Sequence, residues 1–130
     1  MPEASSPRRQ ILLIEDDAAL VALMAKTLLA HGYGVSVARD GLEGLKALDQ
    51  TPPDLIVVDV MMPRLDGMTL VRAIKKHRTT RHIPVIFLTA KSDSRSMVEG
   101  INLGAKFYIT KPFSLDDLLA KVQRALKPSP

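Results

Sequence analysis

The sequence predicts an α/β fold: a doubly wound, five-stranded parallel sheet with strand order 2-1-3-4-5. Short apolar segments alternate five times with longer segments of helical periodicity, a pattern that is typical of this class. The segments at 10–14, 55–59 and 85–89 are almost continuously apolar, as expected for central strands buried on both faces. Those at 35–38 and 107–110 are shorter or mixed, which predicts peripheral strands. Right-handed crossovers then make this strand order the simplest arrangement.

Size and composition predict one globular domain and fit a reducing compartment. A chain of 130 residues, 46% hydrophobic and 25% charged, suits a single domain with a substantial core. The absence of cysteine excludes disulfides and thiolate metal sites. No apolar run approaches the length of a membrane span, so we expect a cytoplasmic protein without membrane contact.

The ends of the chain are polar and carry several prolines. Residues 1–9 contain no apolar stretch of their own, so we expect a disordered lead-in and not a secretory signal. Residues 10–127 form the predicted domain. Residues 128–130 are expected to be a tail or the start of a linker.

The formal net charge is +4, and part of the positive excess is clustered in the sequence. The cluster lies at the end of the third helical segment and just after it: Arg72, Lys75, Lys76, His77, Arg78, Arg81 and His82. Cations favour the C-terminal end of a helix, so the preferred interpretation is a solvated helix end. Nucleic-acid contact is the alternative, although aromatic residues make up only 4% of the chain and no stacking platform is evident.

The first two helical segments have predicted ends and predicted core faces. Gly32 is expected to close the first segment, and Asp40, with Glu43 three residues later, opens the second in a near capping box. One face of the first segment carries apolar or small residues at helical spacing: Leu20, Leu23, Met24, Thr27 and Leu28. Three leucines are expected to line the second segment: Leu42, Leu45 and Leu48.

The remaining three helical segments follow the same pattern. Asp93 is a candidate cap for the fourth, which is expected to end near Gly104, and Ser114 with Asp117 predicts a capping box for the fifth. The third segment, 67–76, is expected to point three residues inward: Met68, Val71 and Ile74. The fourth carries Met97, Val98 and Ile101 at helical spacing. The fifth carries Leu115, Leu118, Leu119, Val122 and Leu126.

Asp59 lies at the end of the central apolar segment. An aspartate there would leave the core at the carboxyl edge of the sheet, where open α/β sheets bind ligands. Aspartate is also a common turn and cap residue, so the position by itself leaves both roles open.

Polar residues also end three other predicted strand segments. Glu15 and Asp16 follow the first segment, Thr89 ends the fourth, and Lys111 follows the fifth. Because parallel strands share one carboxyl edge, these side chains are expected to converge with Asp59. Carboxylates held close together repel unless a cation joins them, and an all-oxygen site suits a hard cation such as Mg²⁺.

These residue types suit phosphoryl transfer. Positive charge from a cation and from Lys111 would neutralise the oxygens of a phosphoryl group. Asp59 would then act as the nucleophile and form an aspartyl phosphate, while the Thr89 hydroxyl would donate to a phosphate oxygen.

Several short motifs of the chain match those of a known family. They are 11–17 (ILLIEDD), Asp59 with Met62-Pro63 and Asp66-Gly67, Thr89-Ala90, Gly104-Ala105, and Lys111-Pro112-Phe113. With these motifs the chain resembles the receiver domain of bacterial two-component response regulators from about Arg9 to Leu126. The resemblance implies the flavodoxin-like fold of the chemotaxis-Y type.

The resemblance also implies a role for each site residue. Asp59 is the expected phosphoacceptor, and Asp16, Asp59 and the Met61 backbone carbonyl are expected to bind Mg²⁺, with Glu15 acting through water. Lys111 and Thr89 would stabilise the phosphoryl group, and the bond from Lys111 to Pro112 is expected to be cis. Thr89 and Tyr108 match the switch pair of the family. Asp17 falls outside the acidic pair and is interpreted as a helix cap.

The partners implied by the resemblance are proteins. A sensor histidine kinase or a histidine phosphotransfer protein would donate the phosphoryl group, and an output protein would bind the face formed by the fourth helix, fifth strand and fifth helix. A phosphorylation-dependent homodimer is a further expectation. Nucleic acid would be contacted only through an effector domain outside these residues.

Three other functions compete with this one. A phosphorylation-independent, receiver-like scaffold for protein interactions is the alternative function. An aspartyl-phosphate phosphatase usually needs a second acid two residues after the nucleophile, where this chain has Met61, so no stand-alone enzyme is expected. Nucleotide binding is disfavoured because no glycine-rich turn follows the first strand.

Overall fold

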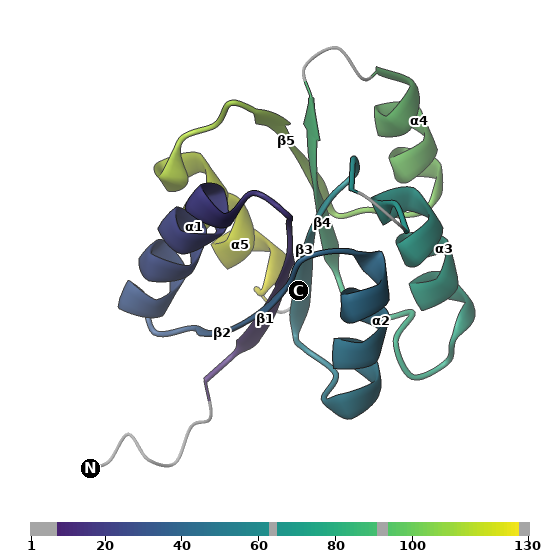
Figure 1. Ribbon diagram of the computed structural model, residues 1–130, viewed down its shortest axis with the longest axis horizontal. Helices are drawn as coiled ribbons and strands as arrows, with labels where there is room; N and C mark the ends of the chain where they lie inside the picture. Colours follow the sequence, from purple (N-terminus) through teal and green to yellow (C-terminus); the bar gives the residue numbers. More distant parts are fainter. Residues whose placement is uncertain (1–7, 63–64, 91–93, 128–130) are drawn as a thin grey trace.

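The sheet has the predicted strand order. The computed structural model describes residues 8–62, 65–90 and 94–127. Five strands pair in parallel in the order β2-β1-β3-β4-β5 (Figure 1). Their bounds are β1 Gln10–Ile14, β2 Gly34–Ala38, β3 Leu55–Asp59, β4 Val85–Ala90 and β5 Phe107–Lys111. β5 therefore includes Lys111, one residue beyond its predicted end.

Helices cover both faces of the sheet. Their bounds are α1 Ala18–Ala30, α2 Gly41–Gln50, α3 Gly67–Lys76, α4 Ser94–Asn102 and α5 Leu115–Ala125. α1 and α5 lie on one face, and α2, α3 and α4 lie on the other (Figure 1). No helix among the described residues is both long enough and apolar enough to cross a membrane.

The core forms two layers, because successive side chains of a strand point to opposite faces. Leu12 and Ile14 of β1 pack with residues of α2 and α3, whereas Ile11 and Leu13 pack with residues of α1 and α5. All five residues of β3 are buried, as predicted for a central strand. β2 is exposed at Ser36 and Val37, which fits its place at the edge.

The predicted helix ends within the described residues are confirmed. The Asp40 side chain accepts a hydrogen bond from the Glu43 amide at 2.9 Å, and the Ser114 hydroxyl accepts one from the Asp117 amide at 3.0 Å. Gly32 and Gly104 follow α1 and α4 with φ of 91° and 87°, a conformation that favours glycine. The predicted cap Asp93 lies outside the described residues, as do Pro63 and both predicted terminal segments except 8–9.

Three leucines expected on the packing faces of α1 and α2 are exposed instead. Leu23, Leu42 and Leu45 are 53%, 48% and 37% exposed. In α2 the packing face is built around Gly44, where an added Cβ would lie 2.8 Å from Ile14 Cδ1. Because a close approach of this kind needs a residue without a side chain, leucine spacing points to the wrong face of α2. In α4, similarly, Val98 and Ile101 are exposed and Gly100 is buried.

Candidate functional site

The candidate site lies at the carboxyl edge of the sheet, as predicted. Glu15 directly follows β1, and Asp59 and Lys111 are the last residues of β3 and β5. Thr89 lies near the end of β4, opposite Thr110 of β5. Glu15, Asp59 and Thr89 are among the few buried polar side chains of the described residues. The parallel register therefore collects side chains that are far apart in the sequence.

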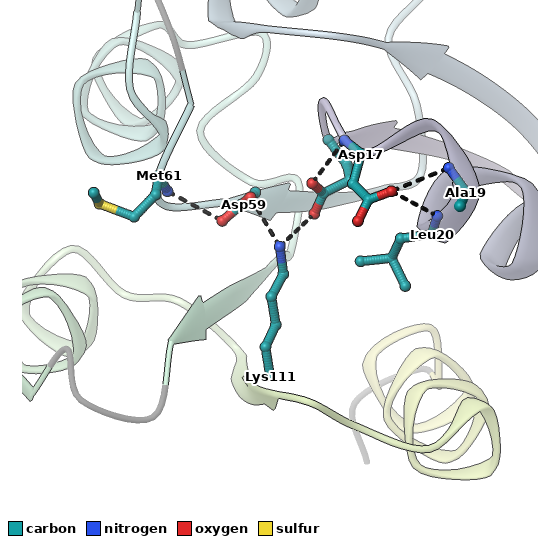
Figure 2. Close-up of polar contacts among 7 residues, drawn as sticks. Asp17, Ala19, Leu20, Asp59, Met61 and Lys111 are labelled. Atoms are coloured by element: carbon teal, nitrogen blue, oxygen red, sulfur yellow. Dashed lines mark hydrogen bonds and ion pairs between the residues drawn. The ribbon is translucent and has the colours of Figure 1, made fainter.

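Lys111 joins two of the carboxylates. Its Nζ donates to Glu15 Oε1 at 2.9 Å and to Asp59 Oδ2 at 3.0 Å, and Figure 2 shows it reaching the end of β3 from β5. Its side chain is 29% exposed, whereas those of Glu15 and Asp59 are 1% and 7% exposed. The Lys111–Pro112 peptide bond is cis, as expected. One amine thus serves two buried acids.

Burial and hydrogen bonding shift the pKa values of Glu15 and Lys111. Burial raises the pKa of Glu15, and the hydrogen bonds from Lys111 and the Asp17 amide only partly offset this. Burial of Lys111 by itself disfavours the charged amine, but its hydrogen bonds to Glu15 and Asp59 and the attraction of their charges together outweigh that effect and raise its pKa. Lys111 therefore stays charged at neutral pH, and Glu15 is an acid whose charge is incompletely compensated.

Three acids form an all-oxygen cluster. One carboxylate oxygen from each of Glu15, Asp16 and Asp59 lies within 4.8 Å of the others, with Glu15 and Asp59 buried and Asp16 exposed. These residues fit a hard divalent cation, because the ligands are all carboxylates and one side opens to solvent for water or phosphate.

Asp17 is not part of this cluster. Its carboxylate accepts from the amides of Ala19 and Leu20 at 3.1 and 3.2 Å (Figure 2). It is the N-cap of α1, which confirms the sequence interpretation. The Asp17 amide in turn donates to Glu15 Oε2 at 3.1 Å, so the start of α1 also holds Glu15 in place.

Both carboxylate oxygens of Asp59 have a donor. The Met61 amide donates to Asp59 Oδ1 at 3.1 Å, and Lys111 holds Oδ2 (Figure 2). The Met61 side chain is 66% exposed, so position 61 contributes to Asp59 through its backbone. These two contacts orient the carboxylate at the end of β3.

Thr89 and Tyr108 lie on neighbouring strands. Thr89 is fully buried, and its hydroxyl donates weakly to the Ala90 carbonyl at 3.4 Å. The Tyr108 ring stacks on Phe87 with centroids 5.6 Å apart. Its hydroxyl is buried without a hydrogen-bond partner among the described residues, and burial raises the pKa of Tyr108 to about 12.

Two glycines near the site were not recognised as structural residues in the sequence. A Cβ on Gly67 would lie 2.4 Å from the Asp59 carbonyl oxygen. Because glycine has no Cβ, α3 can begin against the end of β3. A Cβ on Gly100 would overlap the Tyr108 hydroxyl. The Asp66-Gly67 pair ahead of a helical segment was an available signal, because Asp66 is the N-cap of α3. Nothing local signals the contact of Gly100.

Known proteins share this arrangement. A model of the family described as "Response regulator receiver domain" matches residues 11–123. The chain is 38% identical over 118 residues to the DNA-binding dual master transcriptional regulator RpaA of Synechocystis sp., and equally to the response regulator MprA of a Mycobacterium sp.. These matches cover 91% of this chain and 49% and 50% of the relatives. The chain therefore spans about half the length of the curated relatives it matches.

Solved structures agree with the sequence matches. The chemotaxis protein CheY4 of Vibrio cholerae superposes with a TM-score of 0.86 at 30% identity, covering 92% of this chain and all of that one (100%). The signal receiver domain of a histidine kinase from Syntrophus aciditrophicus superposes with a TM-score of 0.84 at 39% identity, covering 91% of this chain and 89% of that one. With the strand order and the family match over residues 11–123, these likenesses show that the chain belongs to the response regulator receiver domain family.

Proposed function

We propose that this chain is the phosphoacceptor of a two-component phosphorelay and that Asp59 takes up the phosphoryl group. The observation that carries the proposal is the position of Lys111, whose amine lies 3.0 Å from Asp59 Oδ2 within a cluster of three acids. A solvated loop lysine would have no reason to be held between two buried carboxylates. A charged amine beside a nucleophilic carboxylate suits the transfer of an anionic group.

The reaction moves a phosphoryl group between two proteins. A carboxylate oxygen of Asp59 forms a bond to phosphorus while the bond from phosphorus to the donor's histidine nitrogen breaks, and the histidine leaves with the electron pair. Lys111 stabilises the charge on the transferring oxygens, and the Thr89 hydroxyl donates to one of them afterwards. Asp59 is already oriented by the Met61 amide, so little reorganisation is needed.

The acidic cluster is the proposed magnesium site. Asp16, Asp59 and the Met61 backbone carbonyl would hold the ion directly, and Glu15 would act through water. When bound, Mg²⁺ supplies positive charge that offsets the repulsion among the acids and the phosphoryl oxygens. Lys111 would supply a second positive charge, because its amine contacts Asp59 Oδ2 at 3.0 Å.

Thr89 and Tyr108 are the proposed switch. Movement of Thr89 toward the phosphoryl group would vacate space beside Tyr108, and the α4-β5-α5 face would change its shape for an output protein. A two-state element of this kind needs only a local change in charge. The chain assists its own phosphorylation and dephosphorylation in this proposal and is not a stand-alone enzyme.

The proposed partners are a sensor histidine kinase or a histidine phosphotransfer protein as donor and a protein bound at the α4-β5-α5 face as output. RpaA is named as a DNA-binding regulator, so a nucleic-acid output through an effector domain is one form of this proposal. A phosphorylation-dependent homodimer is another. Residues 10–127 are the proposed receiver unit, and the cytoplasm is the proposed location.

Incubation with acetyl phosphate and Mg²⁺, followed by intact mass spectrometry, tests the proposal. The expected result is a gain of one phosphoryl group that is lost with Asp59→Ala and with a chelator. Asp116→Asn, an exposed acid on α5, is the matched control and should be phosphorylated normally. If the wild-type chain gains no phosphoryl group, or if the gain survives Asp59→Ala, the phosphoacceptor proposal fails and the scaffold alternative gains support.

A further inference from the structure

An apolar groove lies between α2 and α3, away from the candidate phosphoacceptor site. Its volume is about 350 Å³, at the lower end of the range for binding clefts. Its lining comes from the C-terminal halves of the two helices and from the segments that follow them, and it includes Leu45, Leu48, Ala73, His77, Thr79 and Thr80. α2 and α3 lie side by side with these ends at the same end of the molecule (Figure 1).

The groove continues onto an exposed apolar stripe of α2. Leu42 and Leu45 lie three residues apart and therefore on one side of the helix, and both are exposed. Leu45 also lines the groove. The fold does not use these two leucines for its own core, although the side chain of Leu48 is buried.

Exposed basic residues surround the α3 end of this groove. We call Lys76, His77, Arg78 and Arg81 the basic rim; all four are exposed. His77 lines the groove, and the other three adjoin lining residues in the sequence. No ion pair joins the basic rim to an acid within 8–62, 65–90 and 94–127. Asp49 is the acidic residue among those lining the groove.

The dipole of α3 does not explain the whole basic rim. A helix dipole accounts for cations in the last turn, where Lys75 and Lys76 lie, but Arg78 and Arg81 follow the C-cap His77. The nearby Lys75 is used differently, because its amine donates to the carbonyls of Arg81 and Ile83 at 3.1 and 3.2 Å. This positive charge is therefore not used within the described fold.

We propose that the α2–α3 groove and its basic rim bind an acidic, amphipathic helical segment of a partner protein. Apolar side chains of the segment would enter the groove beside Leu45 and Ala73, and its acidic side chains would meet the basic rim. A nucleic acid fits less well, because the groove is lined by aliphatic residues and offers no stacking ring other than His77. The interaction would not involve Asp59 or the α4-β5-α5 face, so it does not depend on the proposed phosphorylation.

Binding of synthetic peptides to the unphosphorylated full chain tests this proposal. The probe is a fluorescent helical peptide of about 16 residues with leucine at positions i, i+3, i+4 and i+7 and mainly glutamate elsewhere. A scrambled peptide of the same composition and a lysine-for-glutamate counterpart are the controls. We expect saturable binding of the acidic peptide, at least about tenfold weaker binding of both controls, weakening by salt, and amide NMR shifts at Leu45, Ala73 and Thr79.

Variants locate the binding surface. Ala73→Glu and, separately, Leu45→Glu should abolish binding by placing a charge in the groove, and Arg78→Glu should weaken it several-fold. Lys26→Glu, an exposed basic residue on α1, is the matched control and should bind normally; circular dichroism checks the fold of each variant. The absence of saturable binding, equal binding of the scrambled peptide, or shifts confined to another surface would overturn the proposal. A DNA duplex that shifts the groove residues while the acidic peptide does not would overturn it in favour of nucleic acid.

Discussion

Glu15 is a buried acid whose charge opposes folding. It is 1% exposed and shares one amine, that of Lys111, with Asp59. Because burial outweighs its hydrogen bonds, its pKa is raised above 4.5. The ionised form that a cation site needs is therefore unfavourable for folding while the cation is absent.

Replacing Glu15 by glutamine is expected to stabilise the metal-free protein at neutral pH. The folded protein keeps this proton to a higher pH than the unfolded chain, so the free energy of unfolding falls as pH rises from 4.5 through the folded pKa. Glu15→Gln lacks this penalty, so it should raise the melting temperature by a few degrees at neutral pH. The gain should shrink as the pH falls toward 4.5 and vanish below it.

Urea unfolding in the presence of a chelator, from about pH 8 down to about pH 4, measures this difference. Gln123→Ala, at an exposed position of α5, provides the control for surface substitution, because it changes no titratable group. A Glu15→Gln variant that is less stable than wild type at neutral pH would mean that the hydrogen bond to Lys111 outweighs the burial of the carboxylate.

At the scale of elements, the contact between α4 and β5 leaves one buried hydroxyl without a hydrogen bond among the described residues. The Tyr108 ring is stacked on Phe87, but its buried hydroxyl has no partner among the described residues and lies against Gly100. An unpaired buried hydroxyl costs free energy. The two elements therefore fit closely in shape and poorly in polarity.

Tyr108→Phe is expected to raise the free energy of unfolding by about 1 kcal/mol, because it removes the unpaired hydroxyl and keeps the ring stacking. Gly100→Ala is expected to lower it by about 1–3 kcal/mol, because the new methyl group overlaps the Tyr108 ring edge and hydroxyl.

A double-mutant cycle measured by urea unfolding tests this contact. The cost of Gly100→Ala should be smaller in the Tyr108→Phe background, because part of the overlap is with the hydroxyl. Ala120→Gly on α5, an exposed helical position, checks that the cycle detects only local coupling. Strict additivity of Gly100→Ala and Tyr108→Phe would show that the two residues do not meet.

At the scale of the whole molecule, binding at the acidic cluster is linked to folding. The three acids come from the ends of two strands that are neighbours only in the folded sheet, so the unfolded chain has no comparable site. A ligand that binds only the folded state raises its stability. If the cluster binds Mg²⁺ as proposed, the folded sheet would therefore gain stability from the ion.

Magnesium is expected to raise the melting temperature by a few degrees when its concentration is about ten times the dissociation constant. Asp16→Asn should remove most of this gain, because Asp16 is the solvent-exposed member of the cluster and a proposed direct ligand. Thermal unfolding at matched ionic strength, with NaCl as the control salt, separates this effect from screening. An equal rise in the Asp16→Asn variant would place the ion elsewhere.

The sequence by itself determined the class, the strand order and the members of the candidate site. Continuous apolar runs identified the central strands, because a strand covered on both faces needs apolar residues at every position. Polar residues at the ends of those runs and of the fifth strand identified Glu15, Asp59, Thr89 and Lys111, since all parallel strands present the same edge. These inferences depend on periodicity and chain direction, which are local properties of the sequence.

Only the tertiary structure decided which faces of α2 and α4 are buried and how the site residues meet. Gly44 and Gly100 let other side chains approach closely, and this requirement is set by the neighbouring elements, which helical periodicity does not reveal. The placement of the Lys111 amine between Glu15 and Asp59 likewise depends on the register of three strands. Contacts across the fold are determined by residues distant in the sequence, so no single segment specifies them.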